Sequence, residues 1–251
     1  MKNLIQSIPT QAPFALATVI SRNGSAPRTT GAKMLVRLDG STVGTVGGGA
    51  LENKVRLLAQ EMAGARQEPR SVVRYFVFNG QDAASMDSIC GGNVEVLVEW
   101  LDPAEEQTAA VIAALAEAAQ ARRPAWLVTE LPPQSAPAGG ASPRRGIVGA
   151  GGLLAGELPE GLSAEQVREL RLPAVRAGAL IEPLDIGGAA YIFGAGHVSR
   201  ALAEFVHAVG FHTVVLDDRA EYANRERFPN VDEVVVLPHY ENLRERVALD
   251  E

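Results

Sequence analysis

Glycine-rich turns are the first residues of this chain whose types and spacing could support chemistry. The earlier turn, Gly47-Gly48-Gly49, stands between an apolar run and a segment with helical spacing, and Glu52 follows it. Backbone N–H groups at the start of a helix point outward and can bind an anion such as a phosphate. A tight strand-to-helix turn also uses glycines, because they adopt positive φ without strain. The sequence leaves both interpretations open.

The later turn contains Gly194 and Gly196 and follows the apolar run Ala189–Phe193. The order of strand, glycine turn, helix and strand is that of a dinucleotide-binding β-α-β unit, in which the diphosphate lies at the helix N-terminus. Ser199 occupies the place of the motif's third glycine. Asp217 lies about 20 residues beyond the turn, where an acid can accept a hydrogen bond from a ribose hydroxyl.

Two more side chains belong to this unit. His197 begins the helix and could contact a ligand, or it could be exposed with no role. Arg219 would favour a phosphorylated ribose. The unit therefore predicts an NAD(P) site. The alternative is a unit that serves only packing or dimerisation, because a fold does not imply a function.

Cys90 is the only cysteine of the chain, and Gly91 and Gly92 follow it. Backbone N–H groups close to a thiol favour the thiolate, which is suited to metal or sulfur chemistry. The alternative is a small buried apolar side chain, the more common role of a single cysteine. One cysteine also excludes an intramolecular disulfide, which favours a cytoplasmic location.

The loop Ser25–Lys33 carries two cations, Arg28 and Lys33, together with hydroxyl side chains. The planar guanidinium of Arg28 is suited to phosphate or carboxylate. An ordinary solvent-exposed loop is an equally good interpretation, although functional residues are often found on loops.

Other classes of function have little support in the sequence. The net charge of −7 argues against nucleic-acid binding, which requires concentrated Lys and Arg. No apolar run approaches the roughly 18 residues of a membrane span. Neither a metal-ligand spacing nor a Ser-His-Asp signature is present, so we expect no metal site and no hydrolase.

Apolar periodicity predicts the elements that must position these residues. Strands are expected at Phe14–Ile20, Lys33–Leu38, Thr42–Val46, Val72–Phe78, Val94–Trp100, Ala125–Thr129, Ala189–Phe193, Thr213–Leu216 and Val234–Leu237. Helices are expected at Ala50–Met62, from Pro103 to about Gln120, and at Ser163–Leu170, where Ser163 and Gln166 form a capping box. The Pro- and Gly-rich stretch Leu131–Gly156 predicts an irregular loop with a possible strand at Ile147-Val148.

These elements predict an α/β protein with two domains. An N-terminal α+β domain, residues 1–185, precedes a partial Rossmann-like parallel β-α-β unit, residues 186–251. A complete doubly wound sheet has about six strands, more than this segment supplies. The open sheet edge requires a cover, either the first domain or a second subunit, so we expect a homo-oligomer such as a dimer.

Four separated segments together resemble the XdhC/CoxI family, accessory proteins of xanthine dehydrogenase and related molybdenum hydroxylases. They are ATVISRNGSAPRTTGAKMLV, GTVGGGALE, CGG, and YIFGAGHVSRALA with VVLDDRAEYANRERFP. Because they occur in the family's order, the resemblance is more specific than any one motif.

The resemblance implies a chaperone-like protein that binds the molybdopterin-type molybdenum cofactor and promotes its sulfuration. It would deliver the cofactor to an apo molybdenum hydroxylase, with a cysteine desulfurase as a second partner. An NAD(P)-dependent oxidoreductase is the alternative function. The implied cofactor-binding residues are Arg28, Gly47, Gly48, Gly49, Glu52, Gly91, Gly92, Gly194, Gly196, His197 and Asp217, and Cys90 would contact sulfur or metal.

The chain departs from the family pattern in two ways. Many relatives have cysteine where this chain has Ala50, so a sulfur role would fall on Cys90 or be absent. Relatives also continue beyond the third Rossmann strand. We therefore expect a chain that is shortened at its C-terminus, or one whose sheet another chain completes.

Overall fold

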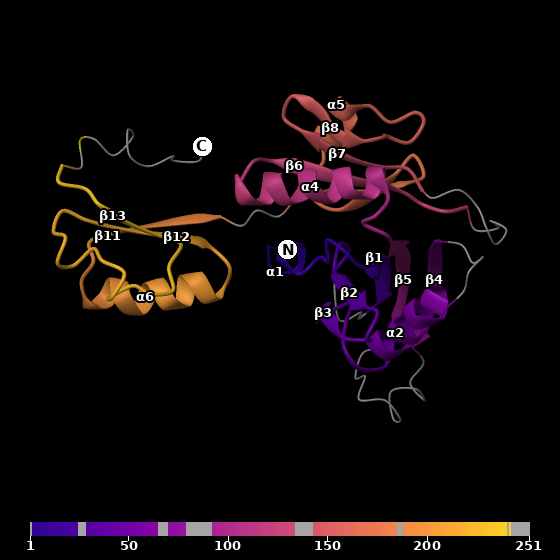
Figure 1. The fold of residues 1–251 in the computed structure, drawn as a ribbon, viewed down its shortest axis with the longest axis horizontal. Helices are drawn as coiled ribbons and strands as arrows, with labels where there is room; N and C mark the ends of the chain where they lie inside the picture. The colour runs from indigo at the N-terminus through magenta and orange to yellow at the C-terminus, as the bar shows by residue number, and fades with distance from the viewer. Residues whose placement is uncertain are drawn as a thin grey trace. The chain divides into compact units, whose positions relative to one another are not determined.

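The computed structural model describes residues 2–24, 29–64, 70–78, 92–133, 143–184, 188–239 and 241 (Figure 1). The chain divides into two compact units, Met1–Ile186 (unit 1) and Gly187–Glu251 (unit 2). Each unit is described by itself. Arg28, Cys90 and Gly91 lie outside the described residues.

Unit 1 contains two five-stranded antiparallel sheets. Sheet A has the strand order β3-β2-β1-β5-β4. Its strands are β1 (Phe14–Gly24), β2 (Lys33–Arg37), β3 (Thr42–Gly44), β4 (Ser71–Phe78) and β5 (Gly92–Leu101). The long central pair β1–β5 runs in register from Phe14↔Leu101 to Gly24↔Gly92. These two strands form the longest pairing in the sheet and lie between its other strands.

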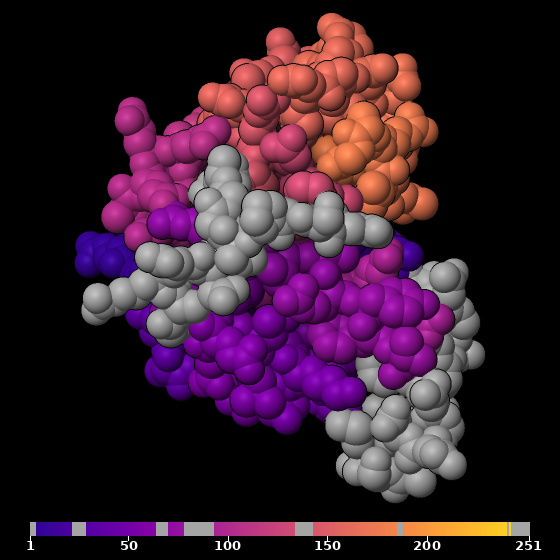
Figure 2. Space-filling model, turned by 90° about the vertical axis from the view of Figure 1, so that its right-hand side faces the viewer, coloured from indigo at the N-terminus to yellow at the C-terminus, as the bar shows by residue number. Residues whose placement is uncertain are grey.

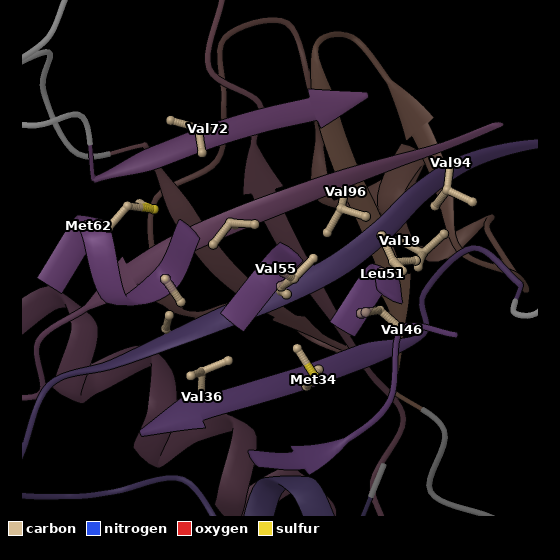
Figure 3. Close-up of a cluster of buried hydrophobic side chains, with 14 residues drawn as sticks. Val19, Met34, Val36, Val46, Leu51, Val55, Met62, Val72, Val94 and Val96 are labelled. Carbon is tan, nitrogen blue, oxygen red and sulfur yellow. The ribbon is translucent and has the colours of Figure 1, made fainter. Parts of the chain in front are cut away.

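Helix α2 (Gly49–Gly64) covers the outer face of sheet A (Figure 3). Its apolar residues at helical spacing pack onto alternate residues of the strands, because successive strand side chains point to opposite faces. The main members of this core are Val19, Met34, Val36, Val46, Leu51, Val55, Met62, Val72, Val94 and Val96. The opposite face of sheet A points toward sheet B.

Sheet B has the strand order β8-β7-β6-β10-β9. Its strands are β6 (Ala125–Glu130), β7 (Arg145–Gly149), β8 (Gly152–Gly156), β9 (Ala174–Arg176) and β10 (Ala179–Pro183). Helix α5 (Ala164–Arg168) packs on its outer face through Val167. Helix α4 (Glu106–Gln120) and the short α1 (Lys2–Gln6) pack on its inner face.

Unit 2 is a three-stranded parallel sheet with the order β11-β12-β13. The strands are β11 (Ala189–Phe193), β12 (His212–Asp217) and β13 (Glu233–Val236), and helix α6 (His197–Ala208) connects the first two. Ala203 of α6 is buried against the sheet in a core that includes Ile192 and Val215.

The predicted fold class is confirmed: an α/β protein with antiparallel sheets followed by a Rossmann-like unit. The capping box at Ser163 and Gln166 is also present. In the Pro- and Gly-rich stretch, where an irregular loop with a strand at Ile147-Val148 is predicted, the described residues 145–156 form the hairpin β7–β8. Helix α4 begins at Glu106 rather than at Pro103, since Asp102 accepts a hydrogen bond from Ala104 N (2.9 Å) in a preceding turn.

Among the described residues, no helix is long and apolar enough to cross a bilayer.

Candidate functional site

Three segments that carry sequence motifs leave sheet A at the same end. Residues 25–28 follow β1, residues 45–48 follow β3, and residues 79–91 precede β5. The register places Gly24 beside Gly92 and Gly44 beside Met34 near the start of β2, so all three strand ends lie toward the same end of the sheet. Antiparallel topology therefore directs the strand ends that flank three motifs, far apart in the sequence, toward one end of one sheet.

These ends are not level with one another. Lys33, beside the end of β3, pairs with Thr18, whereas Gly24 lies six residues further along β1. Six residues of extended strand span about 20 Å. The three strand ends therefore lie toward the same end of sheet A, but the turn Gly47–Gly49 does not lie beside Gly92.

The turn Gly47-Gly48-Gly49 has positive φ at all three positions, 144°, 84° and 52°. L-residues avoid this conformation, so the backbone by itself explains the glycines. A Cβ built on Gly48 would meet nothing within 4 Å. The side of the turn at Gly48 is therefore open to a ligand, and both interpretations of the motif stay possible.

Glu52 has a structural role at the same turn. Its Oε1 accepts hydrogen bonds from the Gly48 N–H (2.9 Å) and from the Thr45 hydroxyl. Thr45 Oγ1 in turn accepts the Gly47 N–H at 3.1 Å. This carboxylate lies in the first turn of α2, where negative charge also stabilises a helix. It therefore holds the turn in place.

Two buried ion pairs join the facing sides of sheets A and B. Lys33 on β2 donates to Glu182 Oε2 on β10 at 2.7 Å and to Thr18 Oγ1 at 2.7 Å. Arg145 on β7 donates through Nε to Glu99 Oε1 on β5 at 3.1 Å. Burial raises the pKa of the Glu182 carboxyl, and the charge of Lys33 opposes that rise.

Lys33 is thus a structural cation and is only 5% exposed. The sequence places it with Arg28 in a loop that carries two cations, but its partner Glu182 is 149 residues away. No local pattern identifies the partner of such a pair. An acidic residue within an apolar strand, as at Glu99 and Glu182, indicates only that a buried cation lies elsewhere in the fold.

The glycine turn of unit 2 is bound to the end of β12. Gly194 has a φ of +89°, and Gly196 is the N-cap of α6. Between them, the Ala195 N–H donates to Asp217 Oδ2 at 2.7 Å, and Arg227 Nη2 donates to the Ala195 carbonyl at 3.4 Å. The conformation of the turn is therefore held from both sides.

The Asp217 carboxylate is bound mainly by Arg219. Its Oδ1 accepts from Arg219 N (2.9 Å) and Nε (3.0 Å), and its side chain is 2% exposed. The bonds from Arg219, followed by that from Ala195, hold the pKa of Asp217 well below its usual range. These bonds engage both oxygens of the carboxylate, whereas Arg219 is 53% exposed and stacks on Tyr222 at 4.2 Å.

The remaining predicted site residues fall as follows. His197 is exposed at the start of α6, and Gly92 begins β5. Within the part of the chain that the structure describes, no group of three or more His, Cys, Asp or Glu residues could hold a metal ion.

Comparisons with known proteins agree with this architecture. Residues 8–75 match the model of the XdhC and CoxI family, and residues 190–250 match that of the XdhC Rossmann domain. The crystal structure of a xanthine dehydrogenase from Bacillus halodurans is similar, with a TM-score of 0.77 and 26% identity. That similarity covers 98% of this chain and 71% of the other.

A curated relative is the uncharacterized protein YqeB of Escherichia coli (strain K12). It is 46% identical over 88 residues, which is 34% of this chain and 15% of that protein. The matched segment is therefore about a third of this chain and a small part of that relative. The two family models, in the order seen along the chain, and the structural similarity over nearly all of it show that this chain belongs to the XdhC and CoxI family.

Proposed function

We propose that this chain is an accessory protein of a xanthine dehydrogenase-type molybdenum hydroxylase. In this proposal it binds the molybdenum cofactor as cargo, holds it during sulfuration, and delivers it to the apo-hydroxylase. A cysteine desulfurase would supply the sulfur. The chain would act by binding and orienting the cofactor rather than by turnover of its own.

One observation supports the proposal: the strand ends that flank the family-like segments, Gly24, Gly44 and Gly92, all lie toward the same end of sheet A. A pterin cofactor with a phosphate requires N–H donors and a guanidinium, and its metal requires a nearby sulfur ligand or acceptor. The roles of Arg28 and Cys90 remain predictions from the sequence, because both lie outside the described residues.

The test is a binding titration of the purified full chain with molybdopterin-type cofactor. We expect stoichiometric binding, weakened at least ten-fold in Arg28→Ala, because a charge-assisted contact contributes about 1.5 to 3 kcal/mol. Cys90→Ala should bind but lose the ability to support sulfuration of the cofactor when a cysteine desulfurase is added. Arg171→Ala, at an exposed position of unit 1, is the matched control for Arg28→Ala. Absence of cofactor binding by the wild-type chain would overturn the proposal.

An NAD(P)-dependent oxidoreductase is the second candidate, and the open glycine turn of unit 2 favours it. Cβ atoms built on Gly194 and Gly196 would meet nothing within 4 Å, so a diphosphate has room to approach. Titration of the same preparation with NADH and NADPH distinguishes the two candidates. Binding of a dinucleotide without binding of the pterin cofactor would favour the oxidoreductase.

A homo-oligomer is part of the proposal because β11 has one strand partner, β12, among the described strands. An open edge of this kind is usually covered. Helix α6 also exposes apolar side chains, among them Val198 (82%) and Phe205 (73%). Sedimentation analysis of the full chain tests this expectation, and a monomer at all concentrations would contradict it.

A further inference from the structure

Unit 1 contains a cleft of about 330 Å³ where sheets A and B separate. Sheet A contributes Ile20, Ser21, Val73 and Glu95, and the other wall consists of Leu131, Pro132 and Pro173–Val175. Figure 2 views unit 1 from a side on which sheet A, in purple, meets sheet B, in pink to orange. A volume of this size is at the lower end of the range for small-molecule sites.

The cleft lies at the end of sheet A from which the motif segments leave. Ser21 pairs with Glu95 three residues before the Gly24↔Gly92 pair. Thr30, which also lines the cleft, directly precedes the Gly31-Ala32 link to β2. The cleft is therefore next to the strand ends that flank the family-like segments.

The lining is suited to a flat ring with apolar faces and polar groups at its edge. Most of the lining side chains are aliphatic or proline, and Ser21, Thr30 and Glu95 supply the polar atoms. Tyr75, which is 54% exposed, pairs with Glu95 across β4 and β5 and lies on the same face of the sheet. An aromatic ring beside Glu95 provides a surface on which a planar ligand can stack.

Glu95 differs from the other acids on this face of sheet A. On β5 the inward-facing positions are Glu95, Leu97, Glu99 and Leu101, since Val94, Val96 and Val98 pack under α2. Glu99 has Arg145 as its partner, and Glu182 of the facing sheet has Lys33. Among the residues that the structure describes, the half-buried Glu95 has neither an ion pair nor a hydrogen bond through its side chain. None of the described side chains therefore engages this carboxylate, which faces the cleft.

One wall of the cleft is fixed by close packing. Gly31 has a φ of +89°, and a Cβ at that position would lie 2.7 Å from Cγ of Pro173. The backbone on the sheet A side therefore lies directly against the residue that precedes β9. A preformed wall reduces the ordering cost of binding a rigid ligand.

We propose that this cleft binds the bicyclic ring of a pterin, with the Glu95 carboxylate facing the 2-amino and adjacent ring N–H donors. These two donors point in one direction, as in a guanidinium, and two carboxylate oxygens match them in a bidentate pair. The inference rests on the cofactor-binding function proposed above. It assigns the position of the ring in unit 1, separately from any contacts of the phosphate and the metal.

The experiment is a titration of free pterin, followed by its intrinsic fluorescence, against the full-length chain and two variants. Glu95→Gln removes the second acceptor oxygen and the charge, and should weaken binding on the order of ten-fold. Val175→Trp, at a position 45% exposed on β9, should fill the cleft and abolish binding. Both variants should keep the wild-type circular dichroism spectrum and thermal midpoint.

Two matched variants serve as controls. Glu61→Gln removes the same charge from the exposed side of α2, and Leu154→Trp adds the same ring to β8, the other edge of sheet B, at a position 56% exposed. Both should bind pterin as the wild-type chain does. Competition by adenosine nucleotides, but not by the molybdenum cofactor, would overturn the choice of a pterin.

The same variants are then titrated with the complete molybdenum cofactor, which separates this inference from the proposed function. If the cofactor binds equally to the wild-type chain, Glu95→Gln and Val175→Trp, the pterin ring does not bind in the cleft, and the proposed function stands. If the wild-type chain binds no cofactor, the proposed function fails and the inference fails with it. Loss in Val175→Trp alone supports the cleft and overturns the role of Glu95.

Discussion

Asp217 shows how a residue in a ligand-binding motif can instead make hydrogen bonds within the protein. Asp217 lies where a dinucleotide-binding unit places its ribose acceptor, yet it binds Ala195 N and Arg219. Its carboxylate therefore fixes the glycine turn and neutralises a cation. Arg219, half exposed beside it, is the side chain of this pair that faces solvent.

We expect Asp217→Asn to lower the free energy of unfolding at pH 7 by about 2 kcal/mol, because hydrogen bonds to a charged group are lost. The pKa of Asp217 is lowered from 3.8 on folding, so its contribution is present above that pH. It is lost as the pH falls further toward the folded-state pKa. Urea unfolding between pH 7 and pH 3 should show the wild-type and variant curves converging in acid.

Asp218→Asn is the control for this prediction, since the Asp218 side chain is 55% exposed. It should change the unfolding free energy by less than about 0.5 kcal/mol. A difference between Asp217→Asn and the wild-type chain that stays constant down to pH 3 would contradict the role of the ionised carboxylate.

Gly48 allows the two interpretations of the Gly47–Gly49 turn to be separated. Gly48→Ala should cost about 1 to 2 kcal/mol of unfolding free energy, because φ is +84° and no atom lies near the new methyl group. We expect the same methyl group to weaken cofactor binding if the turn approaches a phosphate. The measurements are urea unfolding and cofactor titration.

Gly161→Ala is the matched control, with φ +78° and the same open surroundings in unit 1. The two variants should lose similar stability, and Gly48→Ala alone should lose cofactor affinity. Equal affinity in both variants would mean that the Gly47–Gly49 turn serves the backbone only.

At the scale of elements, the contact between sheets A and B is mixed. Leu97, Leu180 and Ile20 form an apolar cluster there, and two ion pairs cross the same contact. A buried pair contributes little net stability, but loss of one partner leaves a buried charge without compensation. The pairs therefore favour one alignment of the sheets over others that the apolar contacts would also permit.

We expect Lys33→Met to lower the unfolding free energy at pH 7 by about 3 to 5 kcal/mol, because Glu182 loses its cation. Burial raises the pKa of Glu182 above its ordinary 4.5, and without Lys33 this rise should be larger. The loss relative to the wild-type chain should therefore be smallest below about pH 4.5 and grow as the pH rises through the folded-state pKa of Glu182. Urea unfolding across this pH range measures the effect.

The double variant Lys33→Met with Glu182→Leu should recover most of the loss, because no buried charge remains. Lys54→Met, at an exposed position of α2, is the control and should leave stability nearly unchanged. A double variant as unstable as Lys33→Met would show that packing, rather than charge, causes the loss.

For the whole molecule, the two units have separate apolar cores. The cluster under α2 contains residues of unit 1 only, and the cluster around Ile192 and Ala203 contains residues of unit 2 only. Opening of one core does not remove contacts within the other. Local stability should therefore differ between the units.

Leu51→Ala tests this separation, because Leu51 is 1% exposed in the core of sheet A. We expect a loss of about 3 kcal/mol in unit 1 from the cavity that forms. Hydrogen exchange should become faster in β1 and β5 and stay unchanged in β11 and β12. Leu57→Ala, 46% exposed on the same helix, is the control, and faster exchange in both units would contradict independent cores.

Several elements follow from local patterns in the sequence. Apolar runs predict β1, β2 and β5, helical spacing predicts α2, and the β-α-β motif order predicts α6. The hairpin β7–β8 and the strands β9 and β10 are less evident, because short runs broken by glycine and proline carry a weak local signal. Their strand conformation depends on pairing with β6, which supplies the backbone partners.

The sequence by itself determines the order of motifs, the two-part architecture and the family, because glycine turns and apolar periodicity are local properties of the chain. The tertiary structure alone decides which polar side chains are free to bind. Lys33, Glu52 and Asp217 look like ligand-binding residues in the sequence. In the structure they make hydrogen bonds within the protein, with partners as much as 149 residues away. Glu95 has no motif, and it becomes a candidate anchor because the folded sheets leave it facing a cleft. Side-chain partners are set by the meeting of distant strands, which no local pattern encodes.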